Sequence, residues 1–80
     1  MLAGPFCAYQ LALLGADAIK IEAPGEGDMM RRSGADRDLG ANGMGTGFLA
    51  QASNKRSLTL DLKTEAGQGV LRRLAERSDV

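Results

Sequence analysis

Two stretches of this sequence carry residues of types that could bind a phosphate group. Three glycines within residues 43–47 precede a short predicted helix over residues 48–52, so their backbone N–H groups could surround a phosphate. Their spacing fits neither a dinucleotide-binding fingerprint nor a Walker loop, and a mobile lid or an ordinary loop would use the same glycines. Lys55 and Arg56 stand at the start of a predicted strand, where they could bind the phosphates of a nucleotide-like ligand. The alternative for these two cations is a solvated strand start.

The other polar or nucleophilic side chains carry weaker signals. Arg31 and Arg32 lie in a glycine-rich stretch, where exposed arginines are common. Asp36 and Asp38 could form a carboxylate pair, but nothing in the sequence buries them, so a solvated turn is expected. Cys7 lies in an apolar predicted helix, which predicts an inert core thiol. Its place near the start of that helix leaves a reactive thiol as the alternative.

The composition excludes several kinds of site. The 80 residues include no histidine and one cysteine, which rules out Ser-His and Cys-His pairs, zinc sites that use imidazole and an internal disulfide. Ten basic and ten acidic side chains give a net charge of zero, so the chain has no electrostatic footprint for nucleic acid or an acidic membrane. The uncharged stretch at residues 1–16, which no other exceeds in length, is shorter than the ~20 residues that a membrane-spanning helix needs and lacks the basic start of a signal peptide. We therefore expect a cytoplasmic protein without nucleic-acid or membrane partners.

The sequence pattern in the first half of the chain indicates a helix and, further on, a long loop. Residues 6–14 form an apolar helix that Pro5 begins and Gly15 ends, and its composition predicts burial on most sides. Residues 25–47 are rich in glycine and show no apolar period, which predicts a long loop. Residues 48–52 close this loop as a short helix.

Two strands and a final helix complete the pattern. Residues 16–22 and 57–62 alternate apolar and polar side chains, which is typical of strands. In the first strand the face that carries Lys20 and Glu22 is expected to be the less buried one. Residues 64–77 have a helical period, with a threonine that can cap the helix and charges of each sign at the favourable end.

The order of these elements predicts an α/β fold with a parallel sheet and crossover helices. A strand is expected before the first helix and another after residue 77, so both ends look cut and the chain looks like an incomplete part of a larger domain. We expect the 80 residues alone to be unstable or to aggregate, because strand edges and an apolar helix face would lack cover.

Five segments together resemble the start of the class III coenzyme A transferases, the group that contains formyl-CoA transferase and carnitine CoA-transferase. These are residues 2–7, 14–22, 25–28, 54–64 and 74–80. The resemblance covers nearly the whole chain, and its second and fourth segments are the most specific.

The resemblance implies that residues 1–80 are an N-terminal fragment of a Rossmann-like large domain, with no second domain present. It implies an enzyme that moves CoA from an acyl-CoA donor to a carboxylic acid acceptor and forms an interlocked homodimer. In that reaction an aspartate attacks the thioester, and a carboxylate nucleophile needs neither a metal nor a prosthetic group. The matching aspartate lies downstream of these residues, so no catalytic residue is assigned here.

The resemblance also implies a role in binding CoA for six residues in two stretches. They are Leu2, Ala3, Leu60, Asp61, Leu62 and Lys63. The first stretch would lie near the pantetheine arm, and the second would line the adenosine-phosphate end, with Lys63 as the phosphate partner. At the position of Ala23 some members carry an arginine that contacts CoA, so that contact is either missing here or supplied by another residue.

Two alternatives stay open. The same superfamily includes α-methylacyl-CoA racemases, which abstract a proton next to the thioester and transfer nothing. The long glycine-rich loop and Asn54 resemble the transferases more closely. The second alternative is a free-standing α/β chain that binds CoA or a partner protein without catalysis.

Overall fold

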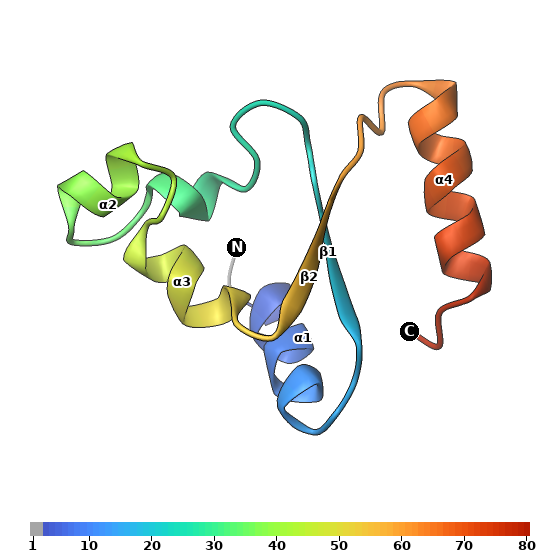
Figure 1. Cartoon of the computed structure of the whole chain (residues 1–80), viewed down its shortest axis with the longest axis horizontal. Coiled ribbons are helices and arrows are strands. Elements are labelled where there is room, and N and C mark those ends of the chain that lie inside the picture. The colour runs from blue at the N-terminus through green and yellow to red at the C-terminus, as the bar shows by residue number, and fades with distance from the viewer. Residues whose placement is uncertain (1–2) are drawn as a thin grey trace.

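The computed structural model describes residues 3–80 and contains two strands and five helical segments. In chain order these are α1 (Ala3–Leu13), β1 (Ala18–Glu22), the 3₁₀ helix η1 (Met29–Arg32), α2 (Arg37–Ala41), α3 (Thr46–Ala52), β2 (Lys55–Thr59) and α4 (Glu65–Glu76). The strands run through the middle of the molecule, with α2 and α3 on one side and α4 on the other (Figure 1). No helix between residues 3 and 80 has the length and apolarity needed to cross a membrane.

The two strands pair in parallel, as predicted. Their register joins Ala18 to Lys55 and Glu22 to Thr59, and the N–H of Leu60 donates to the carbonyl of Glu22 at 3.0 Å. The second strand therefore begins two residues earlier than predicted and ends at Thr59. Its length is set by the partner strand, since β1 offers only five residues for pairing. The mixture of helices with a parallel sheet confirms the α/β class.

The end of α1 and the start of α4 lie where their sequence signals predict, whereas α1 begins at Ala3, two residues before Pro5. Gly15 follows α1 with a φ of +105°, and the N–H of Ala16 donates to the carbonyl of Leu11 at 3.0 Å. At the start of α4, the Thr64 hydroxyl accepts a hydrogen bond from the N–H of Gly67 at 3.0 Å. Local capping chemistry is thus sufficient to place these ends.

The predicted long loop over residues 25–47 is wrong in part, because it contains η1 and α2. Asp28 caps η1 by accepting from the N–H of Met30 at 2.9 Å, and Asp36 caps α2 by accepting from the N–H of Leu39 at 3.0 Å. Short helices of one or two turns have too few residues for an apolar period, so their signal lies in the capping aspartates.

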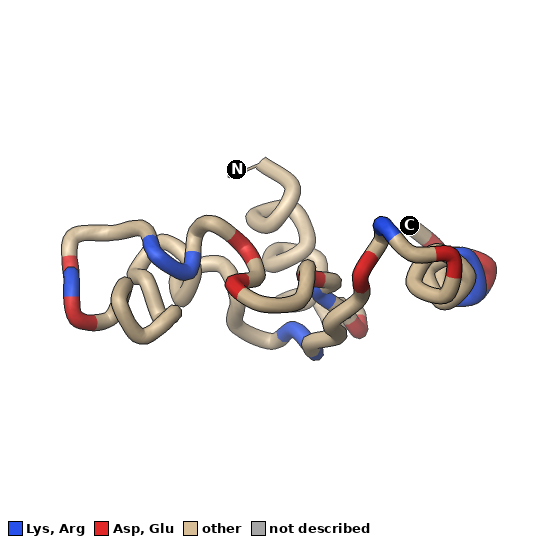
Figure 2. Tube along the Cα trace, turned by 90° about the horizontal axis from the view of Figure 1, so that it is seen from above, with Lys and Arg blue, Asp and Glu red and all other residues tan. Residues whose placement is uncertain are grey.

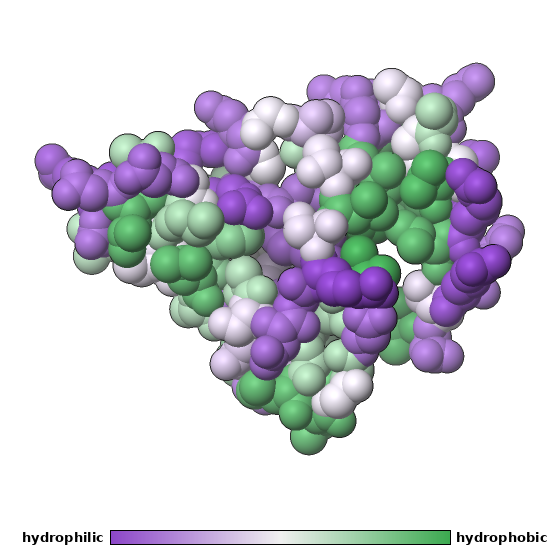
Figure 3. Space-filling model, in the orientation of Figure 1, coloured by the Kyte–Doolittle hydropathy of each residue, from purple (hydrophilic) through white to green (hydrophobic). Residues whose placement is uncertain are grey.

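The predicted burial of α1 on most sides is not found within residues 3–80, whereas the expected lack of cover on its apolar face is found. The helix packs against β1 and α3, yet it contains no buried residue, and Phe6 and Leu13 are about half exposed. Cys7 is exposed as well, so the expected core thiol is not found. An apolar composition indicates that a helix is buried in the complete fold. Among residues 3–80, however, no element covers the outer side of α1. Figure 3 shows apolar surface at this end of the molecule.

The final helix stands apart from the other elements. Its half-buried apolar side chains, Val70, Leu71 and Leu74, are the ones predicted to share a face, whereas Ala66 and Ala75 are exposed. Figure 2 shows the charged residues of α4 gathered on the side turned away from the strands. This amphipathic arrangement is the usual one for a helix that covers one side of a sheet.

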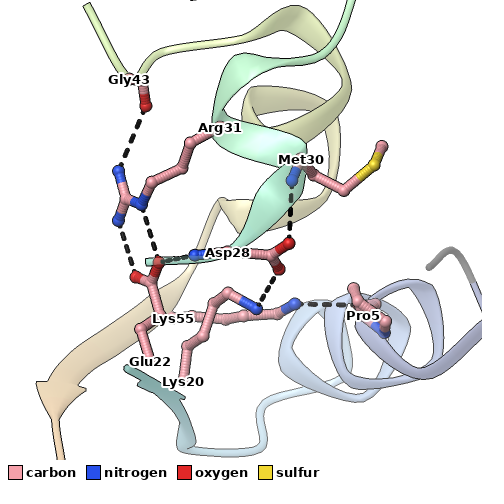
Figure 4. A network of polar contacts seen from close by, with 8 residues as sticks. All are labelled: Pro5, Lys20, Glu22, Asp28, Met30, Arg31, Gly43 and Lys55. Atoms are coloured by element: carbon pink, nitrogen blue, oxygen red, sulfur yellow. Dashed lines mark hydrogen bonds and ion pairs between the residues drawn. The ribbon is translucent and has the colours of Figure 1, made fainter. Parts of the chain in front are cut away.

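The two faces of β1 are covered in the opposite way to the prediction. Glu22 is the most buried residue of the strand, at 7% exposure, whereas Ile19 is 39% exposed. The side with Lys20 and Glu22 is covered because the segment after β1 folds back over it, as Figure 4 shows for Asp28 and Arg31. The reason for the burial of a glutamate is therefore a tertiary contact.

Candidate functional site

The carboxylate of Glu22, at the carboxyl end of β1, accepts three hydrogen bonds. Arg31 of η1 donates from Nε and Nη2 to the two carboxylate oxygens, each at 2.7 Å (Figure 4). The same carboxylate accepts from the N–H of Asp28 at 2.8 Å. Two parallel bonds from a guanidinium to a carboxylate are the strongest geometry for such a pair. We call these residues, Glu22, Asp28 and Arg31, the Glu22 cluster.

The cluster connects β1 to η1 and α3. The remaining guanidinium nitrogen of Arg31, Nη1, donates to the carbonyl oxygen of Gly43 at 3.3 Å. Its guanidinium carbon lies 4.0 Å from the centre of the ring of Phe48, which is the buried hydrophobic side chain of α3. Every guanidinium nitrogen of Arg31 thus has a partner within the protein.

Both members of the central pair stay charged at neutral pH. The pKa of Glu22 is lowered to about 2, chiefly by the hydrogen bond from Arg31 and against a smaller opposing effect of burial. The hydrogen bond from Asp28 and the charges of Arg31 and Lys20 contribute to the same lowering. The pKa of Arg31 is raised by the same pair. A carboxyl group with so low a pKa is not suited to act as a general base, so we assign the cluster a structural role.

Acid is expected to destabilise the protein through Glu22. The unfolded chain, with the ordinary pKa of 4.5, takes up a proton before the folded protein does. The stabilisation present above that value is therefore lost as the pH falls toward 2, with a total of about 3 kcal/mol. Denaturant unfolding of the complete polypeptide over this pH range measures the loss, which should be shallower in Glu22→Gln. An equally steep loss in that variant would contradict the assignment.

The two cations considered as phosphate ligands, Lys55 and Arg56, both contact other groups of the protein. The Lys55 ammonium donates to the carbonyl of Pro5 at 2.9 Å, and burial lowers its pKa (Figure 4). Arg56 donates from Nε to Asp17 Oδ1 at 2.9 Å and from Nη2 to Asp17 Oδ2 at 2.6 Å, with both side chains 67% exposed. Next to Lys55, Lys20 pairs with Asp28 at 2.8 Å and lowers the pKa of that carboxyl. The strand start therefore supports α1 and β1, and the phosphate hypothesis for it is not favoured.

The glycines of residues 43–47 are explained by close packing at Gly45 and Gly47 and by backbone conformation at Gly43. The N–H of Gly45 donates to the carbonyl of Arg31 at 2.6 Å, and a Cβ at Gly45 would overlap the carbonyl oxygen of Ser33. The φ of Gly43 is +73°, which favours glycine. Since the donor of Gly45 is already used, the structure favours an ordinary packed loop over a phosphate cradle.

Of the residues predicted to bind CoA, Leu2 lies outside the described residues, and Ala3 is the exposed first residue of α1. The other four form the turn between β2 and α4. In it, Asp61 Oδ1 accepts from the N–H of Lys63 at 3.0 Å, and the Asp61 carbonyl accepts from the Thr64 hydroxyl at 2.8 Å. Leu62 and Lys63 are exposed, while Leu60 is half-buried. No hydrogen bond or ion pair among residues 3–80 joins the two stretches.

An open cavity of about 430 Å³ lies between the Glu22 cluster and the two strands. Ser57 and Thr59 of β2 line it, together with Ala23, Glu26 and Arg32 from the chain after β1. Sequence reasoning missed this site. The signal that could have found it is a glutamate at the end of a strand followed by arginines in a glycine-rich stretch.

Parallel strands with a polar cavity beside their carboxyl ends are typical of ligand-binding α/β proteins. Comparison with known proteins identifies the family within this broad class. The profile of CoA-transferase family III matches residues 1–80, and the chain belongs to this family.

Curated relatives of this chain are CoA-transferases. It is 44% identical over 79 residues to succinyl-CoA–D-citramalate CoA-transferase of Chloroflexus aurantiacus, covering 99% of this chain and 19% of the relative. It is 41% identical over 80 residues to the succinyl-CoA–L-malate CoA-transferase beta subunit of the same organism, covering 100% and 19%. It is 42% identical over 78 residues to formyl-CoA:oxalate CoA-transferase of Escherichia coli, covering 96% and 18%. The chain thus spans about a fifth of the length of these relatives. No solved structure gives a significant match.

Proposed function

We propose that these 80 residues form part of the coenzyme A site of an enzyme that moves CoA from an acyl-CoA donor to a carboxylic acid acceptor. The observation that carries the proposal is the family membership over all 80 residues. The names of the three relatives support it, since each is a CoA-transferase with a CoA thioester or a carboxylate in its name. These names favour transfer over the racemase alternative.

The turn between β2 and α4 is the part of the structure best suited to contact CoA. It lies just beyond the carboxyl end of a parallel strand, where ligands of α/β proteins commonly bind. The bond from Leu60 N–H to Glu22 O fixes its start, and the Thr64 cap fixes its end. The Lys63 ammonium has no ion-pair partner among residues 3–80, so it is free to bind a phosphate as a point charge.

The proposal includes no catalytic group within the 80 residues. The aspartate nucleophile that the resemblance implies would come from another part of the polypeptide, as would the groups that select the acceptor acid. Ala3 would lie near the pantetheine arm, and the turn near the adenosine-phosphate end. The interlocked homodimer, the Rossmann-like domain and the cytoplasmic location are part of the same proposal.

Replacing Lys63 with glutamine tests the proposal. The complete polypeptide is assayed for transfer of CoA from succinyl-CoA to D-citramalate, L-malate and oxalate, the acids named for its relatives. We expect Lys63→Gln to raise the KM for the acyl-CoA about tenfold, because one charge-assisted contact to a phosphate is lost. The exposed Arg72, replaced in the same way, serves as the control and should leave this KM unchanged. Absence of any new CoA thioester would contradict the activity, and an unchanged KM in Lys63→Gln would contradict the assigned contact.

A further inference from the structure

The cavity beside the two strands contains two arginines in very different states. Arg31 is part of the Glu22 cluster, and its donors are used by Glu22 and by the carbonyl of Gly43. The Glu22 side chain is only 6% exposed. Within this pair the two charges neutralise each other, and each guanidinium nitrogen of Arg31 already has a partner in the protein.

Arg32 is held much more weakly. Its Nη2 lies 3.3 Å from Glu26 Oε2, and its Nη1 lies 3.2 Å from the carbonyl oxygen of the same residue. The side chains of Arg32 and Glu26 are 42% and 80% exposed. Ion pairs between exposed side chains contribute little, because water competes for both charges and both side chains lose conformational freedom. A ligand with a higher negative charge can therefore displace the Glu26 carboxylate.

The surroundings of Arg32 suit a phosphate group. A guanidinium can donate two parallel bonds to phosphate oxygens. The side chains of Ser57 and Thr59 line the same cavity from β2, and their hydroxyl groups are further donors. Ala23 lines it with a single methyl group, which leaves room for a ligand. The strand that carries both hydroxyls leads directly into the turn proposed to contact CoA.

We propose that Arg32 binds a phosphate group of CoA in this cavity, and that the Glu26 carboxylate occupies the phosphate position in the unliganded protein. Glu26 competes with the ligand for the guanidinium and so lowers the affinity. The identity of the ligand rests on the proposed function, whereas the exchangeable Arg32–Glu26 pair rests on the geometry alone.

Two substitutions are expected to act in opposite directions on CoA binding, measured by titration calorimetry on the complete polypeptide. Arg32→Gln should weaken CoA binding about tenfold, because one charge-assisted contact is lost. Glu26→Gln should tighten it a few-fold, because the competing carboxylate is removed. Arg37→Gln is the matched control, since Arg37 is exposed in α2 and does not line the cavity. Circular dichroism checks that each variant is folded.

Dephospho-CoA identifies which phosphate group is bound. If Arg32→Gln weakens the binding of CoA but not of dephospho-CoA, Arg32 contacts the 3′-phosphate. If it weakens the binding of both ligands equally, Arg32 contacts the diphosphate. Either result supports the proposal. CoA binding that is unchanged in Arg32→Gln would overturn it while leaving the proposed function intact.

If the wild-type protein binds no CoA at all, the proposed function fails, and inorganic phosphate then tests the cavity alone. Phosphate binding that Arg32→Gln abolishes and Glu26→Gln strengthens would support the site. Absence of phosphate binding to the wild type would overturn it.

Discussion

Replacing Glu22 with alanine is expected to lower the free energy of unfolding by about 3 kcal/mol. The substitution leaves the guanidinium of Arg31, which is only 25% exposed, without its carboxylate partner. It also removes the acceptor for the N–H of Asp28. Removing one member of a largely buried pair is costly, because the remaining charge is poorly solvated and unpaired. Chemical denaturation of the complete polypeptide measures the effect.

The control for this prediction is the exposed pair between Asp17 and Arg56. It has the same two-bond geometry, but both side chains are 67% exposed. Asp17→Ala should therefore cost less than about 1 kcal/mol. Similar losses in the two variants would show that burial of the Glu22 carboxylate does not matter, and the structural role of the cluster would have to be abandoned.

Replacing Gly67 with alanine is expected to destabilise the protein by about 2 kcal/mol. A Cβ at this position would overlap the carbonyl oxygen of Asp61, which is backbone and cannot rotate away. The carbonyl of Asp61 also accepts a hydrogen bond from the hydroxyl of Thr64. A shift of this carbonyl therefore disturbs the threonine cap of α4. The KM for the acyl-CoA should rise in the same variant, since the shifted turn carries Lys63.

The matched control lies two residues further along the same helix. A Cβ at Gly69 would meet no atom within 4 Å, so Gly69→Ala relieves the entropic cost of a helical glycine without a clash. It should stabilise the protein by up to about 1 kcal/mol and leave the KM unchanged. Thermal unfolding of the two variants compares them directly. Equal effects of the same sign would show that the turn does not press against α4 as described.

The features that local sequence predicted correctly depend on neighbouring residues in the chain. Gly15 ends α1 because its positive φ is easily adopted by glycine, and Thr64 begins α4 because its hydroxyl reaches the N–H of Gly67. The alternation of apolar and polar side chains predicted both strands. The family could also be recognised from the sequence, because each of the family's motifs is a contiguous run of residues.

The candidate site was less predictable. Glu22 was assigned to the less buried face of its strand, and Arg31 was taken as an exposed loop residue, yet they form the central pair of the cluster. Neither error could be corrected from local patterns, because nine positions separate the two residues and η1 has no apolar period. Likewise, Lys55 was a plausible phosphate ligand until the fold brought it to the carbonyl of Pro5, fifty positions away.

The sequence by itself determined the α/β class, the end of α1 and the start of α4, because short-range sterics, capping and alternation act within a few residues. It also determined the family. Only the tertiary structure decided which charges are paired. The folding of residues 25–47 back over β1 commits Arg31 to Glu22 and leaves Arg32 with a weak, exposed partner in the cavity. Adjacent arginines of identical chemistry thus differ in availability because burial and the distance to a carboxylate are properties of the folded chain.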